Sequence, residues 1–267
     1  MNISKIRQQF YRQSRLWITT LLIIGVTLMS CSKSAQSDQT VKISPELEKQ
    51  ILQVIRQHPE VILESVQAYQ QQQESQLQQA RQTLLDQMKT NPQAVIGASP
   101  VRGSEAKNII LVEFSDFQCP FCSRAHETIQ QFMKANQDQV TLVYKHFPLT
   151  QIHPQALSAA KASWAAQQQG KFWEYQNALF TKQNQLGEEL YQAIAKQLNL
   201  DLEKFNRDRQ SPEAEAEIQK DIQLGDSLGI SGTPFFIMNG ESFSGAVELS
   251  KIEAVLATVK ASKGKKN

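Results

Sequence analysis

The sequence predicts an α/β protein in which a block of helices interrupts the sheet and a helical extension precedes it. Three observations point to this class. Residues 108–114 form a short, nearly continuous apolar run, which is typical of a strand buried on both faces. Residues 154–228 follow a helical pattern throughout. Residues 234–238 and 241–244, separated by Asn239-Gly240, predict a β-hairpin with a type I′ turn.

Residues 1–30 are typical of an export signal. Residues 1–15 are basic, and an apolar run over 16–29 follows. A membrane-spanning helix needs about 20 apolar residues, so this shorter run is better suited to a signal peptide. The run ends in Leu28-Met29-Ser30-Cys31, which resembles a bacterial lipobox and predicts a lipoprotein with its lipid on Cys31. An ordinary signal peptide followed by an idle cysteine is the alternative.

A flexible tether over 31–43 and a helical extension over 44–93 are expected next. Ser44-Pro45 is a helix start, and His58-Pro59 separates two helices. The second helix carries a narrow stripe with an eleven-residue repeat, made of Val66, Tyr69, Gln73, Leu77, Ala80, Leu84 and Met88. Such a stripe predicts either packing along another surface or self-association into a homo-oligomer.

The rest of the chain alternates strands and helices. Asn91-Pro92 closes the helical region, residues 97–103 form a turn-rich joint, and a second strand is expected at 140–147. Residues 94–152 are thus the first half of the sheet domain, 153–228 the helical insertion and 229–262 the second half. Ser250-Lys251-Ile252-Glu253 predicts a capping box that opens the last helix, and 263–267 form a basic tail.

The charge of the chain excludes nucleic acid as an expected partner. Of 28 basic residues four precede Cys31, which leaves 24 against 26 acidic residues in the rest of the chain. This part therefore lacks the basic stripe that a phosphate-backbone binder needs. Three cysteines are also too few for a disulfide scaffold.

Cys119-Pro120-Phe121-Cys122 stands between a predicted strand and a predicted helix. Unpaired N–H groups at a helix start favour a thiolate, and in C-x-x-C sites the thiol pKa falls from about 8.5 to about 3.5–7.5. Cys122, one helical turn on, is suited to resolve a mixed disulfide. We therefore expect redox chemistry and no metal. A structural disulfide, or half of a zinc site with His126, is the alternative.

This order of motifs resembles the DsbA family, a thioredoxin fold with an inserted helical domain. The resemblance covers about residues 94–262. It rests on the run Glu113–Cys122, on Phe147-Pro148-Leu149 with His153-Pro154, and on Gly232-Thr233-Pro234-Phe235. It implies a thiol:disulfide oxidoreductase with a redox-active Cys119–Cys122 disulfide. It also implies a cis Thr233-Pro234 bond facing the cysteines, with Thr233, Pro234, Pro120 and Phe121 binding the substrate.

Glu113 is an acidic residue in an apolar strand, where an unpaired carboxylate is costly. The resemblance implies that it lies below the cysteines and exchanges protons with Cys122. The alternative is a structural pair with Lys145 at the edge of the sheet. We expect His153 to cap or orient a helix start, and His126 to be exposed on its helix.

Residues 44–90 resemble the N-terminal extension of some dimeric or trimeric DsbA relatives of the suppressor-of-copper-sensitivity type, in the run Ile55–Glu64. The predicted protein is a membrane-anchored, extracytoplasmic oxidoreductase, at the periplasmic side or the cell surface, that uses no cofactor. Its partners would be exported cysteine-containing proteins and a membrane redox recycling partner, with oxidation the favoured direction. Isomerisation or reduction by an oligomer is one alternative, and a non-catalytic metal-binding lipoprotein is another.

Overall fold

The structure is a computed structural model that describes residues 44–264, without the side chains at 85, 88, 89, 92, 263 and 264. The predicted signal peptide, Cys31, the tether up to residue 43 and residues 265–267 of the tail lie outside this range. The chain divides into two units at residue 64, and each is described by itself. None of the described helices is long and apolar enough to span a membrane.

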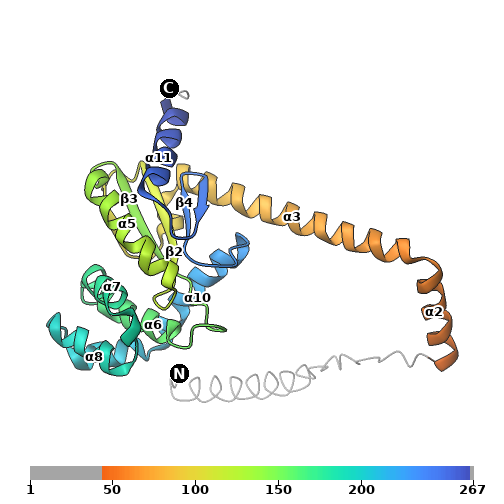
Figure 1. The fold of residues 1–267 in the computed structure, drawn as a ribbon, viewed down its shortest axis with the longest axis horizontal. Coiled ribbons are helices and arrows are strands. Elements are labelled where there is room, and N and C mark those ends of the chain that lie inside the picture. The colour runs from red at the N-terminus through yellow and green to blue at the C-terminus, as the bar shows by residue number, and fades with distance from the viewer. Residues whose placement is uncertain (1–43, 265–267) are drawn as a thin grey trace, which may run out of the picture. The chain divides into compact units, whose positions relative to one another are not determined.

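A five-stranded sheet forms the centre of the second unit (Figure 1). The strand order is β1-β3-β2-β4-β5, in which β2 and β3 are parallel and all other neighbours are antiparallel. Parallel neighbours need a crossover connection, and helix α5 (Pro120–Asn136) provides it. The strands are β1 (Val101–Gly103), β2 (Ile109–Ser115), β3 (Val140–His146), β4 (Phe235–Met238) and β5 (Glu241–Ser244).

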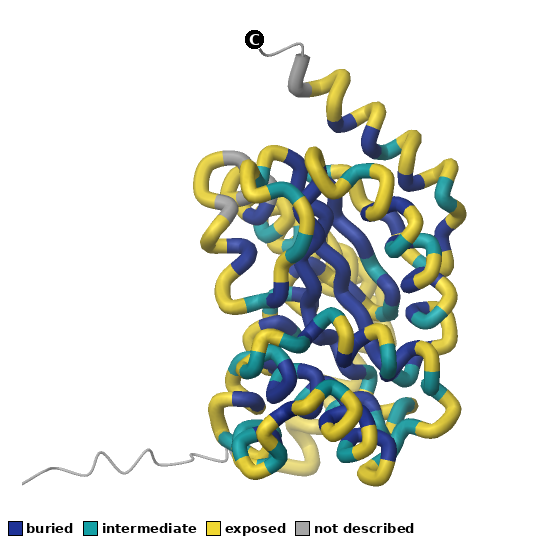
Figure 2. Tube along the Cα trace, turned by 90° about the vertical axis from the view of Figure 1, so that its left-hand side faces the viewer, coloured by how far each residue is buried: buried dark blue, intermediate teal, exposed yellow. Residues whose placement is uncertain are grey.

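The central strand β2 is buried along its whole length, as its apolar run predicts. Leu111 belongs to the face that packs against α5 and α11 (Leu249–Gly264). Ile110 and Val112 belong to the opposite face, which packs with Leu84, with α4 (Pro92–Ile96) and with the end of α10 (Pro212–Ser227). The buried strands between exposed helices are the dark-blue interior of Figure 2.

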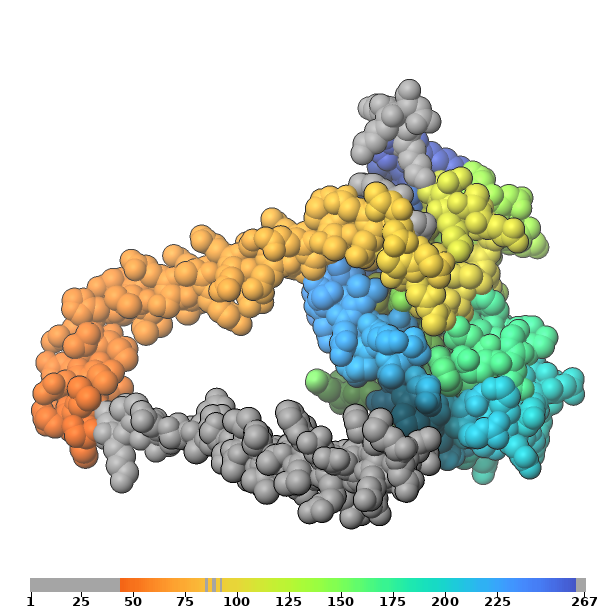
Figure 3. Space-filling model, turned by 180° about the vertical axis from the view of Figure 1, so that it is seen from behind, coloured from red at the N-terminus to blue at the C-terminus, as the bar shows by residue number. Residues whose placement is uncertain are grey.

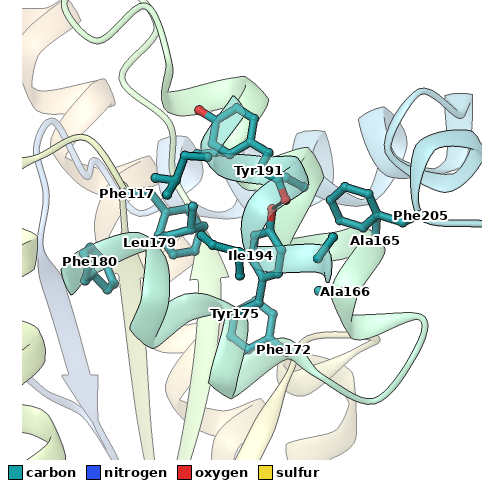
Figure 4. Close-up of a cluster of buried hydrophobic side chains, with 14 of the residues drawn as sticks. Phe117, Ala165, Ala166, Phe172, Tyr175, Leu179, Phe180, Tyr191, Ile194 and Phe205 are labelled. Carbon is teal, nitrogen blue, oxygen red and sulfur yellow. Dashed lines mark hydrogen bonds between the residues drawn. The ribbon is translucent and has the colours of Figure 1, made fainter. Parts of the chain in front are cut away.

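Between β3 and β4 lies the helical insertion, whose core is rich in aromatic side chains and alanine (Figure 4). The Tyr175 hydroxyl donates to the Tyr191 carbonyl oxygen at 3.0 Å within this core. The same cluster includes Cys119 and Cys122, so the insertion packs directly against the cysteines. Its helices are α6 (Ala156–Gln167), α7 (Phe172–Thr181), the 3-10 turn η1 (Gln183–Gln185), α8 (Glu188–Gln197) and α9 (Leu202–Arg209), and α10 leads from them back to the sheet.

The hairpin β4–β5 has the predicted turn, because Asn239 and Gly240 both adopt positive φ angles of 46° and 112°. Two other expectations are wrong. Residues 101–103 are strand β1 and not part of a joint, since Arg102 pairs with Leu142 of β3. Helix α11 begins at Leu249, so Ser250 lies inside its first turn and is not the cap of a capping box.

The first unit contains α2 (Pro45–Gln57) and the start of α3 (Pro59–Thr90). As predicted, Ser44 caps α2, its hydroxyl accepting from the Leu47 N–H at 3.2 Å. The large apolar side chains of this unit are more than two-fifths exposed, and they are Leu47, Ile51, Leu52, Val54, Ile55, Val61, Ile62 and Leu63. A short segment with this many exposed apolar side chains is typical of an interface.

The rest of α3 belongs to the second unit, and its predicted stripe is divided in two. Val66 and Tyr69 are 47% and 62% exposed, whereas Leu84 is buried in the sheet core. Leu77 packs on Gly229, where an added Cβ would lie 2.9 Å from the Leu77 side chain. Figure 3 shows this part of α3, in yellow, against the blue segment that contains α10. The C-terminal half of the stripe therefore packs on its own domain.

Candidate active site

Cys119 directly precedes α5, and Pro120 occupies the first helical position, where a missing N–H costs nothing. The Cys119 carbonyl oxygen accepts from the N–H groups of Cys122 and Ser123 at 3.1 and 3.2 Å. Cys122 is therefore one turn into the helix and fully buried, and Cys119 is 3% exposed. Both thiols are free, so the structure represents the reduced site.

The loop before β4 meets Cys119 from the other side. The Cys119 thiol donates to the Thr233 carbonyl oxygen at 3.3 Å, and the Thr233-Pro234 peptide bond is cis. Phe121 is 50% exposed beside the cysteines, with the Arg124 guanidinium 4.6 Å above its ring. The expected substrate-binding residues Pro120, Phe121, Thr233 and Pro234 thus lie in the two segments that flank the sulfur.

The environment separates the two thiols chemically. A hydrogen bond from the Cys122 thiol is the largest of several causes that lower the pKa of Cys119 to about 5. The Thr233 hydroxyl and the backbone N–H groups of Cys122 and Phe121 also lower it, so the predicted helix start is a secondary cause. Burial raises the pKa of Cys122 well above its usual value. Cys119 is therefore the group suited to attack as a thiolate.

Glu113 lies in the central strand and not at a sheet edge. It pairs with Tyr144 of β3 on one side and with Phe236 of β4 on the other, and it is 1% exposed. The alternative pair with Lys145 is wrong, because the Lys145 ammonium bonds to Asp221 at 2.9 Å. Burial is the main cause that raises the pKa of Glu113 to about 7. Its carboxyl group can therefore hold or release a proton near neutral pH.

A second acidic residue, Asp116, fastens the loop before Cys119. Its carboxylate is fully buried and accepts from the N–H groups of Gln118 and Leu149 at 2.7 and 2.9 Å. His153 Nδ1 lies 2.7 Å from the same carboxylate. The His153 side chain does not cap the following helix, since its ring reaches back to Asp116, 37 positions earlier, while the His153 carbonyl oxygen accepts from the N–H of Ala156 at the start of α6. Both residues lie in motifs that carry the resemblance to the DsbA family, but nothing in those motifs indicates that the two side chains meet.

The described fold and site can be compared with known proteins. A family model described as DSBA-like thioredoxin domain matches residues 110–257, more than half of the chain. The chain belongs to the DsbA-like thioredoxin family. The predicted fold class and the predicted enzyme class, a thiol oxidoreductase, are confirmed by this match.

Solved structures agree with this DsbA-like assignment. A thioredoxin-like oxidoreductase from Silicibacter pomeroyi is 31% identical, with a TM-score of 0.59 over 64% of this chain and 99% of that chain. Proteus mirabilis ScsC in a transitional conformation is 22% identical, with a TM-score of 0.58 over 81% of this chain and 96% of that chain, and supports the fold alone.

Among curated relatives, Na(+)/H(+) antiporter NhaA 3 of Salinispora tropica is 33% identical over 162 residues, which are 61% of this chain. The DsbA-like chain spans about a quarter of the length of the curated relatives it matches. The antiport activity in that name refers to the larger protein, of which only about a quarter is matched here.

Gln183 is a residue of the DsbA-like site that sequence reasoning missed. Its side-chain amide donates to the carbonyl oxygens of Phe117 and Cys119 at 2.8 and 2.9 Å. Gln118 makes a reciprocal link, its side-chain oxygen accepting from the Gln155 N–H at 2.6 Å. The helical insertion thus holds the turn that carries Cys119. Glutamine is so frequent in this chain that neither residue could have been recognised beforehand.

His126 differs from its expected exposed position. It is 5% exposed, its ring lies tilted against Phe180 at 4.7 Å between ring centroids, and it is within hydrogen-bonding distance of Asn177 and Gln130. Burial is the main cause that lowers its pKa, which favours the neutral ring. Within residues 44–264, no group of three histidine, cysteine or acidic side chains could hold a metal ion.

Proposed function

We propose that this chain oxidises cysteine pairs of exported proteins through a Cys119–Cys122 disulfide. The observation that carries the proposal is the contrast between the two thiols, because the pKa of Cys119 is lowered to about 5 while that of Cys122 is raised. Cys119 is then the better leaving group of the two at neutral pH, so a mixed disulfide on Cys119 is readily resolved by release of the Cys119 thiolate.

In the proposed reaction, a client thiolate attacks Cys119 of the oxidised protein. The Cys119–Cys122 bond breaks, a client–Cys119 bond forms, and the Cys122 sulfur takes up a proton held by Glu113. The second client thiolate attacks the first client sulfur and releases Cys119 as a thiolate. The client loses two electrons in forming its disulfide, and the disulfide form of the protein gains them and becomes the dithiol. The Thr233 carbonyl oxygen, 3.3 Å from Cys119, is available to a backbone N–H of the client.

Oxidation is the favoured direction because whatever stabilises the Cys119 thiolate stabilises the reduced protein. The test is the redox equilibrium of the purified protein with a glutathione buffer. We expect a potential less reducing than the roughly −270 mV of thioredoxin. A value at or below that of thioredoxin would instead support the reductase alternative.

We also propose that the protein acts outside the cytosol, held to a membrane by lipid on Cys31, with exported proteins as clients and a membrane protein that reoxidises it. The support is the basic segment, the apolar run and the Leu28–Cys31 motif. Two acyl chains are enough for stable anchoring. Fractionation of cells that express the full chain tests this placement.

The isomerase alternative is favoured by one specific observation, the exposed apolar side chains of residues 44–64. If copies associate through this segment, two or more Cys119 sites would meet one client and raise the local thiol concentration. Refolding of a scrambled disulfide protein, compared between wild type and a non-associating variant, tests this role. The metal-binding alternative has no comparable support among the described residues.

A further inference from the structure

Four polar side chains lie together beneath Cys119, on the face of the sheet that α5 covers. Glu113 and Ser115 are two residues apart in β2 and therefore share one face. Tyr144 pairs with Glu113 from β3, and Cys122 approaches from α5. The Cys122 sulfur accepts from the Asp116 N–H at 3.4 Å, which fixes it beside the end of β2.

These groups are buried without conventional partners. Ser115 is 1% exposed, and its Oγ, Glu113 Oε1 and the Tyr144 hydroxyl make no hydrogen bond of ordinary geometry within the described residues. Leaving a buried polar group unpaired costs about 1–3 kcal/mol each. A core that only needed stability would be filled here by apolar residues.

Ser115 lies between the other members, because it shares a strand face with Glu113 and is followed by Asp116, whose N–H donates to the Cys122 sulfur at 3.4 Å. In agreement with this position, its hydroxyl lowers the pKa of both Glu113 and Cys122, against the larger effect of burial. It lowers that of Tyr144 in the same way. A hydroxyl can accept one proton while it donates another, so it can connect a thiol with a carboxyl group.

We propose that the Ser115 hydroxyl relays the proton between the Cys122 sulfur and the Glu113 carboxyl group. When Cys122 attacks a mixed disulfide on Cys119, its S–H proton passes to Ser115 Oγ as the Ser115 proton passes to Glu113. The sulfur–sulfur bond to Cys119 forms and the client leaves as a thiolate. The reverse sequence delivers a proton to Cys122 during oxidation. This relay rests on the proposed function, because it serves the same exchange.

The other charged groups near the relay come from three elements. The positive charge of Arg102 in β1 lowers the pKa of Glu113, against the larger effect of burial. His146 of β3 is the strand partner of Ser115. Burial lowers the pKa of His146 to about 3, so it stays neutral through the tested range. Asp116 follows Ser115 in the chain, and β4 contributes Phe235 and Phe236 opposite Phe114 and Glu113. Glu113, whose pKa burial raises to about 7, therefore titrates within the tested range.

The test uses the reduced full chain and an aromatic disulfide reagent, whose coloured thiol is released in two phases. The first phase is attack by Cys119, and the second is resolution by Cys122. We expect Ser115→Ala to leave the first phase unchanged and to slow the second about a hundredfold at neutral pH, at the low end of what proton transfer contributes. The deficit should shrink at alkaline pH, where solvent base removes the proton.

Further variants separate the hydroxyl from the fold. The side chains introduced by Ser115→Thr and Ser115→Val have the same shape, but only threonine carries a hydroxyl. Only the Thr variant should therefore keep the second phase near the wild-type rate. Ser163→Ala is the matched control, a buried serine whose hydroxyl bonds its own helix at Ala160, and it should change neither phase. Combining Ser115→Ala with Glu113→Gln should be no slower than Glu113→Gln alone.

A wild-type second phase in Ser115→Ala, or equal rates in the Thr and Val variants, would overturn the relay. If Glu113→Gln is slow while Ser115→Ala is not, Glu113 keeps its proposed role without Ser115. If Cys119 fails to react before Cys122 in the wild type, the proposed function itself fails.

Discussion

The carbonyl oxygen of Thr233 lies 3.3 Å from the sulfur of Cys119, although the two residues are 114 positions apart. In the protonated site the thiol donates to this oxygen. Neither a thiolate nor a disulfide sulfur has a proton to donate, so ionisation or oxidation of Cys119 leaves the oxygen without its partner. We therefore expect the carbonyl to be available to a client N–H in the oxidised protein, which the client thiolate attacks.

Alkylation should distinguish the two cysteines. Because the pKa of Cys119 is lowered to about 5, its reaction with iodoacetamide should reach a plateau above about pH 6, whereas Cys122 should stay unreactive until alkaline pH. Mass spectrometry of the reduced protein gives both rates. Cys122→Ser should accumulate client mixed disulfides on Cys119. Equal rates, with a Cys119 pKa near 8.5, would contradict a tuned nucleophile.

Glu113 should make the stability of the reduced protein depend on pH. Its folded-state pKa is raised from 4.5 to about 7, so its favourable contribution is complete below pH 4.5 and is lost as the pH rises through 7. Relative to Glu113→Gln, wild type should lose up to roughly 3 kcal/mol over this interval, because the opposite contribution of the Cys119 thiolate is common to both proteins. Urea unfolding of both proteins at pH 5 and pH 8 measures the difference. Parallel changes in the two proteins would rule out this carboxyl as the source.

Asp116 should contribute to both stability and loop position. Asp116→Asn puts an amide group where three donors converge, so we expect a loss of about 2–4 kcal/mol. His153→Ala removes one partner and should cost less, about 1–2 kcal/mol. Asp138→Asn, at an exposed position, is the control. If urea unfolding gave Asp116→Asn the same free energy of unfolding as that control, the stabilising role of Asp116 would be contradicted.

Exposed side chains of α2 should mediate self-association of the mature chain. Ile55→Glu places a charge at a 42% exposed apolar position and should shift the sedimenting species to a monomer, while Gln57→Glu should not. A monomeric wild type at tens of micromolar would contradict the interface. Truncation at Ala94 is a poor substitute, because it removes Leu84 from the sheet core.

The lipid anchor can be tested by labelling cells with a radioactive fatty acid. Cys31 is the position at which the predicted lipobox places the modification. Cys31→Ser should abolish incorporation, and Cys119→Ser is a control that should retain it. Label persisting in Cys31→Ser would refute the modification.

Local patterns predicted the parts of this fold that local physics determines. The apolar run of β2 and the Asn239-Gly240 turn could be assigned because burial on both faces and positive φ angles each select few residue types. Strand β1 could not, since three residues carry no periodicity and only pairing with β3 makes them a strand. The bonds Asp116–His153 and Gln183–Cys119 join distant positions through residues of ordinary type, so only the folded chain identifies them.

The amide of Gln183 has a consequence for protein engineering. From within the helical insertion it donates hydrogen bonds to the carbonyl oxygens of Phe117 and Cys119. The insertion can therefore not be exchanged without affecting the turn that carries Cys119. A chimera that takes this insertion from a relative inherits whatever side chain stands at that position. Without a side chain there that can donate two hydrogen bonds, the grafted enzyme would keep its cysteines but lose the contacts that hold the turn between Phe117 and Cys119 in place.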